Sequence, residues 1–151
     1  MSIYETIGIF DPQDVLPYSR IGCPSVKKFK IKNRVYSVKM NKRQYRLFDS
    51  NSTCVSCGIK GNLMLLKVGK YWKVKDYFFN LYAKDANCQL ILMTQDHIVS
   101  RHKGGSNSVH NLQTMCEICN RIKGNSHRTP KEVNIIRKKK IIEKYMAKRV
   151  D

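Results

Sequence analysis

The sequence predicts an α+β fold, in which a strand–loop–strand–helix core is stapled by four cysteines. Three observations support this prediction. Two Cys-x-x-Cys pairs stand at 54–57 and 116–119 and bracket the region between them. Two short apolar runs at 90–93 and 112–115 have the length of buried strands. A capping box at 129–132 opens a C-terminal helix, which completes the helical part of the fold.

The charge of the chain favours a polyanionic partner. Its 151 residues include 29 Lys plus Arg and 11 Asp plus Glu, which gives a formal net charge of +18. Such an excess attracts nucleic acid, which we expect as the partner. No apolar run reaches the roughly 18 residues of a membrane span, so no membrane partner is expected. The first residues lack a basic segment followed by a long apolar one, so we expect no secretion signal and a cytoplasmic location.

The N-terminal third is expected to form an irregular arm followed by a basic hairpin. Residues 1–26 hold three prolines and no clear periodicity. Residues 27–46 contain nine Lys or Arg and no acid. Apolar and basic residues alternate at the start of this segment, β-formers follow at 35–38, and Asn33-Arg34 is the expected turn. The basic face can track a phosphate backbone, or its lysines can protect an edge strand from aggregation, and the sequence favours neither interpretation.

The rest of the chain shows the periods of further strands and helices. Apolar residues at i, i+3, i+4, i+7 and i+8 from Val74 predict an amphipathic helix, and the capping box at Thr129 predicts a long one. In chain order we expect a strand at 63–66, a helix at 74–84, a strand at 90–93, a loop at 103–107, a strand at 112–115, and helices at 116–124 and 129–150.

The six cysteines indicate a metal site more than a disulfide framework, because no secretion signal is expected. Four of them form the two close pairs, at Cys54, Cys57, Cys116 and Cys119. Two such pairs supply the four thiolates that Zn²⁺ binds tetrahedrally, and a closed site of this kind is structural. A redox pair and an iron–sulfur site are the alternatives. The other two, Cys23 and Cys88, are expected to be ordinary buried or partly buried thiols.

A second set of residues suits a hard cation and phosphate chemistry. Asp96 offers an anionic oxygen ligand, and the amide oxygen of Asn120 offers a second one. His97 can act as a general base near neutral pH if its other ring nitrogen is held by an acceptor. Asn111 can orient that ring or position its loop. Hydrolysis of a phosphodiester needs an attacking water, a base and a cation on the phosphate, so these residue types together indicate a nuclease.

The arrangement resembles the HNH endonuclease family, in its zinc-containing four-cysteine branch, and looks phage-like. The resemblance covers roughly residues 54–125 and implies the ββα-metal core of that family, with a divalent ion in its crevice. The matching motifs are Asp96-His97-Ile98, Asn111-Leu112-Gln113 and Cys116-x-x-Cys119-Asn120-x-x-Lys123-Gly124.

The resemblance also assigns roles to single residues. It implies that His97 is the general base, that Asn111 orients it, and that Lys123 helps near the phosphate. Asp96 and Asn120 become the ligands of the catalytic ion. Asn120 stands where the family name has its second histidine, and this oxygen ligand favours Mg²⁺ or Mn²⁺.

The residues around these motifs are expected to contribute less. Among the remaining histidines, His102 and His110 lie in the loop between the strands and His127 follows the helix, so surface positions or phosphate contacts are expected. Arg101, Lys103 and Arg121 are candidate phosphate contacts.

The sequence therefore predicts a metal-dependent endonuclease that acts on DNA, with duplex DNA as the expected substrate. RNA cleavage and a non-catalytic zinc-ribbon module that only binds nucleic acid are the alternatives. A monomer would nick one strand, whereas a homodimer could break both. We expect an N-terminal arm and basic hairpin at 1–50, a zinc-stabilised nuclease core at 51–128, and a basic helix at 129–151.

Overall fold

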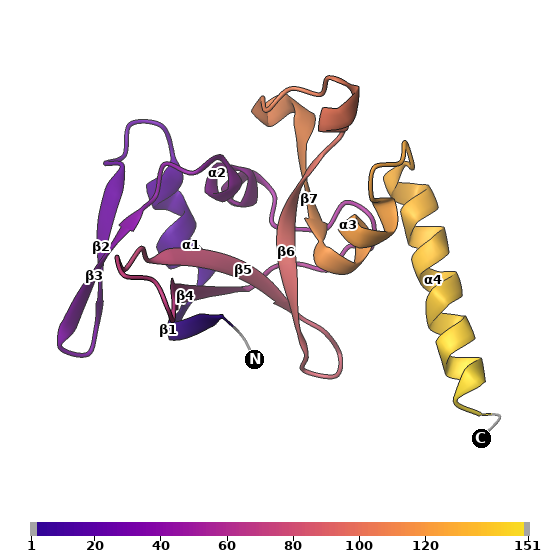
Figure 1. Ribbon diagram of the computed structural model, residues 1–151, viewed down its shortest axis with the longest axis horizontal. Helices are drawn as coiled ribbons and strands as arrows, with labels where there is room; N and C mark the ends of the chain where they lie inside the picture. The colour runs from indigo at the N-terminus through magenta and orange to yellow at the C-terminus, as the bar shows by residue number, and fades with distance from the viewer. Residues whose placement is uncertain (1–2, 150–151) are drawn as a thin grey trace.

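A five-stranded antiparallel sheet with the order β1-β4-β5-β6-β7 forms the centre of the molecule (Figure 1). The computed structural model describes residues 3–149. The strands of this sheet are β1 (Tyr4–Phe10), β4 (Leu63–Gly69), β5 (Phe78–Lys84), β6 (Leu90–His97) and β7 (Leu112–Cys116). A separate hairpin consists of β2 (Val26–Ile31) and β3 (Arg34–Lys39).

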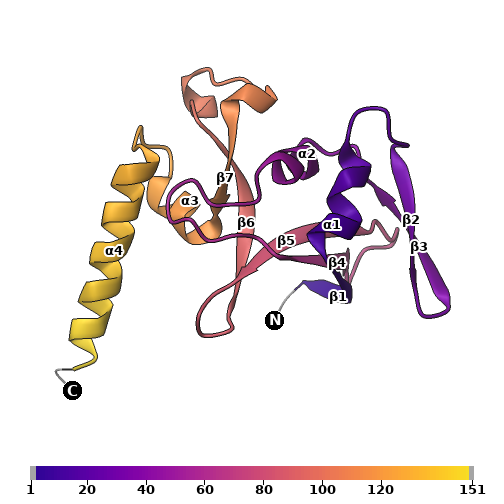
Figure 2. The ribbon, with the colours of Figure 1, turned by 180° about the vertical axis from the view of Figure 1, so that it is seen from behind.

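Helices complete the predicted α+β fold, which is confirmed. They are α1 (Pro12–Val15), α2 (Arg43–Ser50), α3 (Glu117–Lys123) and α4 (Pro130–Ala147), with short 3-10 turns η1 (Leu16–Ser19), η2 (Arg101–Lys103) and η3 (Val109–Asn111). The hairpin and α4 lie at opposite ends of the molecule, as the two opposed views show (Figures 1 and 2). No helix between residues 3 and 149 combines the length and apolar character that crossing a membrane requires.

The expectation of an irregular arm at the N-terminus is wrong for most of its length. β1 pairs antiparallel with β4 along the edge of the main sheet, with a register shift between Thr6 and Gly8. Ile31 packs so closely over Gly8 that an added Cβ would lie 2.7 Å from its side chain. The prolines fall after this strand, at the start of α1, in η1 and before β2, where a missing backbone donor costs little.

The helix expected at 74–84 is also wrong, because β5 is a strand. Phe79, Leu81 and Ala83 are buried, whereas the residues between them are more exposed, which is the alternation of a strand. The helical spacing of the apolar residues arises because both faces of this strand carry aromatic side chains. Residues 70–77 connect β4 to β5, and the two strands pair antiparallel.

The basic hairpin is present, but its turn is formed by Lys32 and Asn33, one residue earlier than expected. Lys32 adopts a left-handed backbone with φ of 51°. Phe29 and Val38 are buried on one face, and Phe29 packs edge-on against Phe79 with ring centroids 4.9 Å apart. The hairpin therefore belongs to the same hydrophobic core as the main sheet, and its exposed face is basic.

Helix α2, which the sequence did not reveal, connects the hairpin to the core. Tyr45, Leu47 and Phe48 are buried, and the Tyr45 hydroxyl accepts a hydrogen bond of 2.8 Å from the backbone N–H of Phe79. Burial raises the pKa of Tyr45 to about 12. Arg43 of the same helix is exposed, and the amphipathic pattern spans only about two turns.

The C-terminal helix begins with the predicted capping box. The Thr129 hydroxyl accepts from the backbone of Glu132, and the Glu132 carboxylate accepts from the backbone N–H of Thr129. Val133 is the buried residue of the helix, and every position from Lys138 to Arg149 is exposed. The helix ends at Ala147, and the expected end at Val150 lies outside the described residues.

The two unpaired cysteines were expected to be buried or partly buried, and this is wrong. Cys23 and Cys88 are both exposed and free. Cys88 lies in the turn between β5 and β6, where its backbone has a left-handed φ of 61°. Neither residue takes part in the core, because each lies in a connection between elements.

Candidate metal centre and crevice

The sequence motifs converge where β6, β7 and α3 meet. Asp96 and His97 end β6, and Asp96 lies opposite Gln113 in the antiparallel register with β7. Cys116 ends β7 and caps α3, and Lys123 is the last residue of that helix. This strand–loop–strand–helix order was predicted, and it brings residues 27 positions apart, such as Asp96 and Lys123, into contact.

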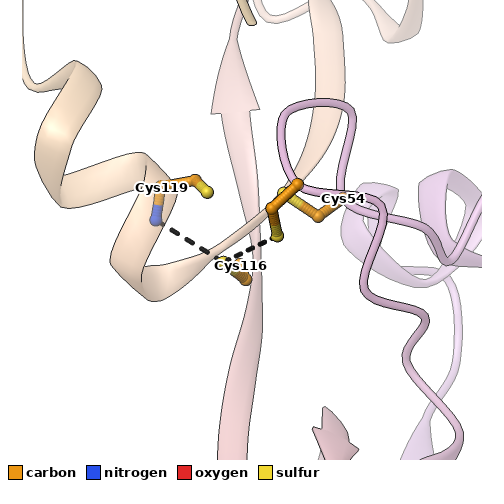
Figure 3. A group of neighbouring side chains, drawn as sticks. Cys54, Cys116 and Cys119 are labelled. Carbon is orange, nitrogen blue, oxygen red and sulfur yellow. Dashed lines mark hydrogen bonds between the residues drawn. The ribbon is translucent and has the colours of Figure 1, made fainter. Parts of the chain in front are cut away.

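The four paired cysteines form one cluster, as predicted. Their Sγ atoms all lie within 4.8 Å of one another. Figure 3 shows Cys116 and Cys119 at the start of α3, with Cys54 on the loop that approaches from the other side. Backbone hydrogen bonds hold that loop: Val55 donates to Thr114 on β7, Gly58 donates back to Cys54, and Cys54 donates to Ile59. Gly58 has a φ of 77°, which eases the tight reversal between the paired thiols.

The thiols affect one another's ionisation strongly. A hydrogen bond from Cys119 lowers the pKa of Cys116 to about 6, and one from Cys116 lowers the pKa of Cys54. Hydrogen bonding with Cys116 raises the pKa of both Cys57 and Cys119. Four thiolates cannot gather at this distance without a compensating cation, so the cluster has the chemistry of a metal site.

The donor set fits Zn²⁺. Four ligands at the usual zinc–sulfur distance of about 2.3 Å lie about 3.8 Å from one another in a tetrahedron. The Sγ atoms of Cys57 and Cys116 are 3.8 Å apart. Cys54, Cys116 and Cys119 are each at most 1% exposed, and all four positions are sulfur, so the site is closed. An ion here would join the 54–58 loop to the start of α3.

Arg137 of α4 completes the surroundings of this cluster. Its Nη1 donates to the sulfurs of Cys57, Cys116 and Cys119 at 3.2, 3.0 and 3.2 Å. Burial lowers the pKa of Arg137, but the hydrogen bond to Cys119 and the charges of Cys57 and Cys116 outweigh it, so the net pKa is raised. Arg137 lies in the run Arg137-Lys138-Lys139-Lys140 of the expected basic helix, and nothing in its spacing pointed to the cysteines.

A second polar cluster surrounds Asp96, which is only 7% exposed. The Lys123 ammonium lies 2.9 and 3.1 Å from its two carboxylate oxygens, and Gln113 donates to Oδ2 at 2.8 Å. Lys123 also donates to the backbone carbonyl of His97 at 2.7 Å. Lys123 is only 3% exposed, so it is not a free surface cation. Its contacts instead hold the Asp96 carboxylate and the His97 backbone in place.

His97 is held by a residue that the sequence did not single out. Its Nε2 lies 2.9 Å from Oδ1 of Asn107, in the loop between β6 and β7. An amide oxygen can only accept, so this contact places the ring proton on Nε2 and leaves the lone pair on Nδ1. Arg43 of α2 steadies the same loop by donating to the Asn107 carbonyl at 2.9 Å.

Asn111 fixes the loop and does not contact the His97 ring. Its Oδ1 accepts from the backbone N–H of Val99 at 2.8 Å, and its Nδ2 donates to the carbonyls of Val99 and Ser106 at 3.0 and 2.8 Å. Gly105 lies beneath this clamp, where an added Cβ would be 1.8 Å from the Val99 carbonyl oxygen. The hydrogen bonds of the Asn111 side chain therefore hold the loop that also carries Asn107.

Asn120 faces the same crevice from α3. Its Nδ2 donates to Oγ1 of Thr94 at 2.9 Å, and that hydroxyl donates to the Met115 carbonyl at 2.8 Å. This chain of hydrogen bonds uses the amide NH₂ group and leaves Oδ1 as the available ligand atom. The crevice has a volume of about 310 Å³ and is lined by Gln95, Asp96, His97, Ser100, Arg101, His102, Asn120, Lys123, Gly124 and Asn125.

The crevice fits a hard divalent cation. Asp96 and Asn120 would supply a carboxylate and an amide oxygen, the donor types that Mg²⁺ and Mn²⁺ prefer. The buried Oγ of Ser100 has no hydrogen-bond partner within residues 3–149, so the crevice also keeps a polar atom for a water or a phosphate oxygen. The ammonium of Lys123 shares the Asp96 carboxylate with any such cation.

The other expected phosphate contacts divide into two groups. Arg101 and His102 line the crevice. Lys103 instead contacts His127, and Arg121 lies 3.7 Å from Glu117 in an ion pair within α3. His110 is exposed in η3, outside the lining of the crevice.

Comparison with known proteins identified one family. Residues 86–126 match the family model described as HNH endonuclease. This segment includes β6, the connecting loop, β7 and α3, and thus every residue of the crevice. Neither curated proteins nor solved structures gave a match.

Proposed function

We propose, from the match of residues 86–126 to the HNH endonuclease family model, that the protein is a metal-dependent endonuclease that hydrolyses phosphodiester bonds of DNA. The family implies a nuclease with a nucleic-acid substrate. The observation that carries the finer proposal is the crevice bordered by Asp96 and His97 of β6 and by Asn120 of α3, the helix whose start carries two of the four clustered thiols.

In this proposal His97 is the general base. The Asn107 hydrogen bond keeps the proton on Nε2, so Nδ1 can take a proton from an attacking water. Asp96 and Asn120 would hold Mg²⁺ or Mn²⁺, which supplies positive charge to the phosphate and the leaving oxygen. Lys123 and Gln113 position Asp96, and Asn111 positions the loop that carries Asn107.

The four thiols would hold a structural Zn²⁺. Cys116 and Cys119 lie at the start of α3, and Asn120 follows directly, so an ion on the thiols would fix the proposed ligand of the catalytic ion. In this proposal the sulfur ligands stabilise the fold, and the oxygen ligands Asp96 and Asn120 serve catalysis.

Duplex DNA is the proposed substrate. Cleavage of RNA in preference to DNA would revise this part of the proposal. The net charge of +18 favours any polyanion, and the hairpin is a two-stranded β-ribbon with exposed lysines, a kind of element that the major groove of DNA admits. One crevice cuts one strand, so a monomer would nick and a homodimer would break the duplex.

Metal dependence tests the proposal. We expect zinc-loaded protein to convert supercoiled plasmid to relaxed or linear DNA when Mg²⁺ or Mn²⁺ is added, and not without it. Omitting the ion is the right control, because a chelator would also strip the thiol site. Asn120→Ala should need a higher Mg²⁺ concentration for half-maximal rate, since it removes a ligand and keeps the base. DNA binding without cleavage under any divalent ion would support a zinc-ribbon binding module instead.

The hairpin lysines give a second prediction, on salt dependence. Lys28 and Lys30 are exposed and have no acidic partner among the described residues. The variant K28Q/K30Q should flatten the slope of log K against log salt by about 1.8, at about 0.9 for each phosphate that is no longer neutralised. The control K60Q/K84Q removes the same charge at two other exposed lysines and should change the slope less.

Equal slopes for the two double variants would assign the hairpin lysines to protection of the strand edge. Deleting the whole segment would not answer the question. Residues 1–46 include β1 of the main sheet and the buried Phe29, Val38 and Tyr45, so their removal would expose the core.

A further inference from the structure

The guanidinium of Arg137 is directed at sulfur. Its Nη1 donates hydrogen bonds to three cysteine Sγ atoms, at distances between 3.0 and 3.2 Å. Among the described residues, Arg137 forms no ion pair with a carboxylate. An arginine that is neither fully exposed nor paired with an acid needs another source of negative charge, and here the cysteines supply it.

The contact has the geometry of an outer cap on the cluster. Nη1 touches Cys57, Cys116 and Cys119 but not Cys54, so it lies over the face that those three sulfurs form. The fourth sulfur occupies the opposite apex, and a cation held by all four would lie inside that face. The arginine therefore donates from outside the ligand set and takes no ligand position.

Charge explains why such a cap is useful. Four thiolates around Zn²⁺ leave a net charge of −2 in a site where three of the sulfurs belong to buried residues. Buried charge is costly unless it is paired and hydrogen-bonded. Hydrogen bonds to charged acceptors are the stronger kind, and the two N–H hydrogens of Arg137 Nη1 are shared among three sulfurs.

The same contact determines how α4 is attached. At its start the helix is held by Val133, which is fully buried, and by the Pro130 carbonyl, which accepts from Ser56 Oγ at 2.9 Å. Arg137 lies about one turn further along, and the helix is exposed from Lys138 onward. Figure 1 shows this helix beside α3, away from the sheet. Arg137 is thus the last attachment of α4 to the thiol cluster.

We propose that Arg137 is a positioning residue of the zinc site, which neutralises the thiolates from outside and couples metal binding to the docking of the basic helix α4. This inference rests on the proposed zinc, and on no step of the proposed cleavage. Thiolates accept hydrogen bonds more strongly than thiols, and a bound cation keeps all four cysteines deprotonated, so loading the site favours docking of the helix. In return, the docked arginine retains the metal.

Two substitutions and one matched control test the coupling. Arg137→Met removes charge and donors at similar length, and Arg137→Lys keeps the charge but loses the planar fork. Lys138→Met is the control, because Lys138 is the exposed neighbour on the same helix. In the full-length protein, we expect Arg137→Met to release zinc to a chelator at least about 10-fold faster than wild type, as for other outer-sphere partners of metal ligands. Arg137→Lys should be intermediate, and Lys138→Met unchanged.

A spectroscopic measurement separates this role from simple loss of packing. With Co²⁺ in place of zinc, removal of the hydrogen bonds makes the thiolates more electron-rich. The sulfur-to-cobalt charge-transfer band of Arg137→Met should therefore move to lower energy, while the tetrahedral d–d bands persist. Trypsin should also cleave after Lys138–Lys140 faster in Arg137→Met than in wild type, at equal zinc content. If Arg137→Met does not fold, Arg137→Lys carries both measurements.

Unchanged release rates and charge-transfer energies in Arg137→Met would overturn the inference. A wild-type protein that binds neither zinc nor Co²⁺ would overturn it together with the proposed zinc site. DNA cleavage by wild type is measured separately. If the protein does not cleave DNA, zinc release, charge-transfer energy and trypsin cleavage still test the coupling between Arg137, the metal and α4.

Discussion

Cys116→Ser is expected to release the zinc and to unfold the region from the 54–58 loop through α3. Cys116 is fully buried at the end of β7, and its Sγ caps α3 by accepting a hydrogen bond from the backbone N–H of Cys119 at 3.5 Å. The same Sγ accepts a hydrogen bond from Arg137. Structural zinc contributes on the order of 10–16 kcal/mol in zinc-finger peptides, whereas a whole domain is stable by about 5–15 kcal/mol. Loss of one ligand therefore removes a large share of the stability of the fold.

The measurements are zinc content by elemental analysis and thermal unfolding by circular dichroism. We expect about one zinc per wild-type chain, and much less than one in Cys116→Ser, with loss of the cooperative transition. Cys88→Ser is the matched control, because Cys88 is free, exposed and outside the cluster. Freshly purified, reduced wild-type protein without zinc would refute the structural role of the metal.

His97→Ala is expected to lower the rate of DNA cleavage by about 10²–10⁴-fold, the usual contribution of a general base. Binding of DNA and zinc content should change little, because the ring is needed only to activate water. Its contacts support this separation. The ring meets Asn107 in an exposed loop, whereas the His97 carbonyl, which the substitution keeps, accepts from Lys123.

Asn107→Ala makes the expectation more specific. It keeps the base and removes the acceptor that holds the proton on Nε2, so it should lower the rate by less than His97→Ala does. His110→Ala is the control, as an exposed histidine of the same loop that does not line the crevice. If the His97→Ala variant cleaves DNA at close to the wild-type rate with saturating Mg²⁺, the general-base assignment is wrong, and so is the proposed mechanism.

Local chemistry decided which parts of the fold the sequence could predict. Metal-ligand spacing and capping depend on residues within a few positions of one another, so the paired cysteines and the capping box at Thr129 were readable without the rest of the chain. The strands before Asp96 and Cys116 were also readable, because each is a short apolar run between polar segments.

Secondary structure was mispredicted where tertiary burial overrides local pattern. The aromatic residues of β5 have helical spacing, but pairing with β4 and β6 buries Phe79, Leu81 and Ala83 on one face. Polar and apolar residues alternate little along β1. It is an edge strand of the sheet, and its strand conformation depends on its pairing with β4. Strand propensity mostly measures such neighbours, and a single sequence does not contain them.

By itself the sequence determined the chemistry of this protein: which residues can bind soft and hard cations, and that the chain favours a polyanion. Only the tertiary structure decided which side chains control those residues. Asn107 meets His97, Lys123 and Gln113 meet Asp96, and Arg137 meets the thiols. The physical reason is that a ligand's identity is a property of its own atoms. Its orientation and charge balance instead depend on partners that folding brings from distant positions in the chain.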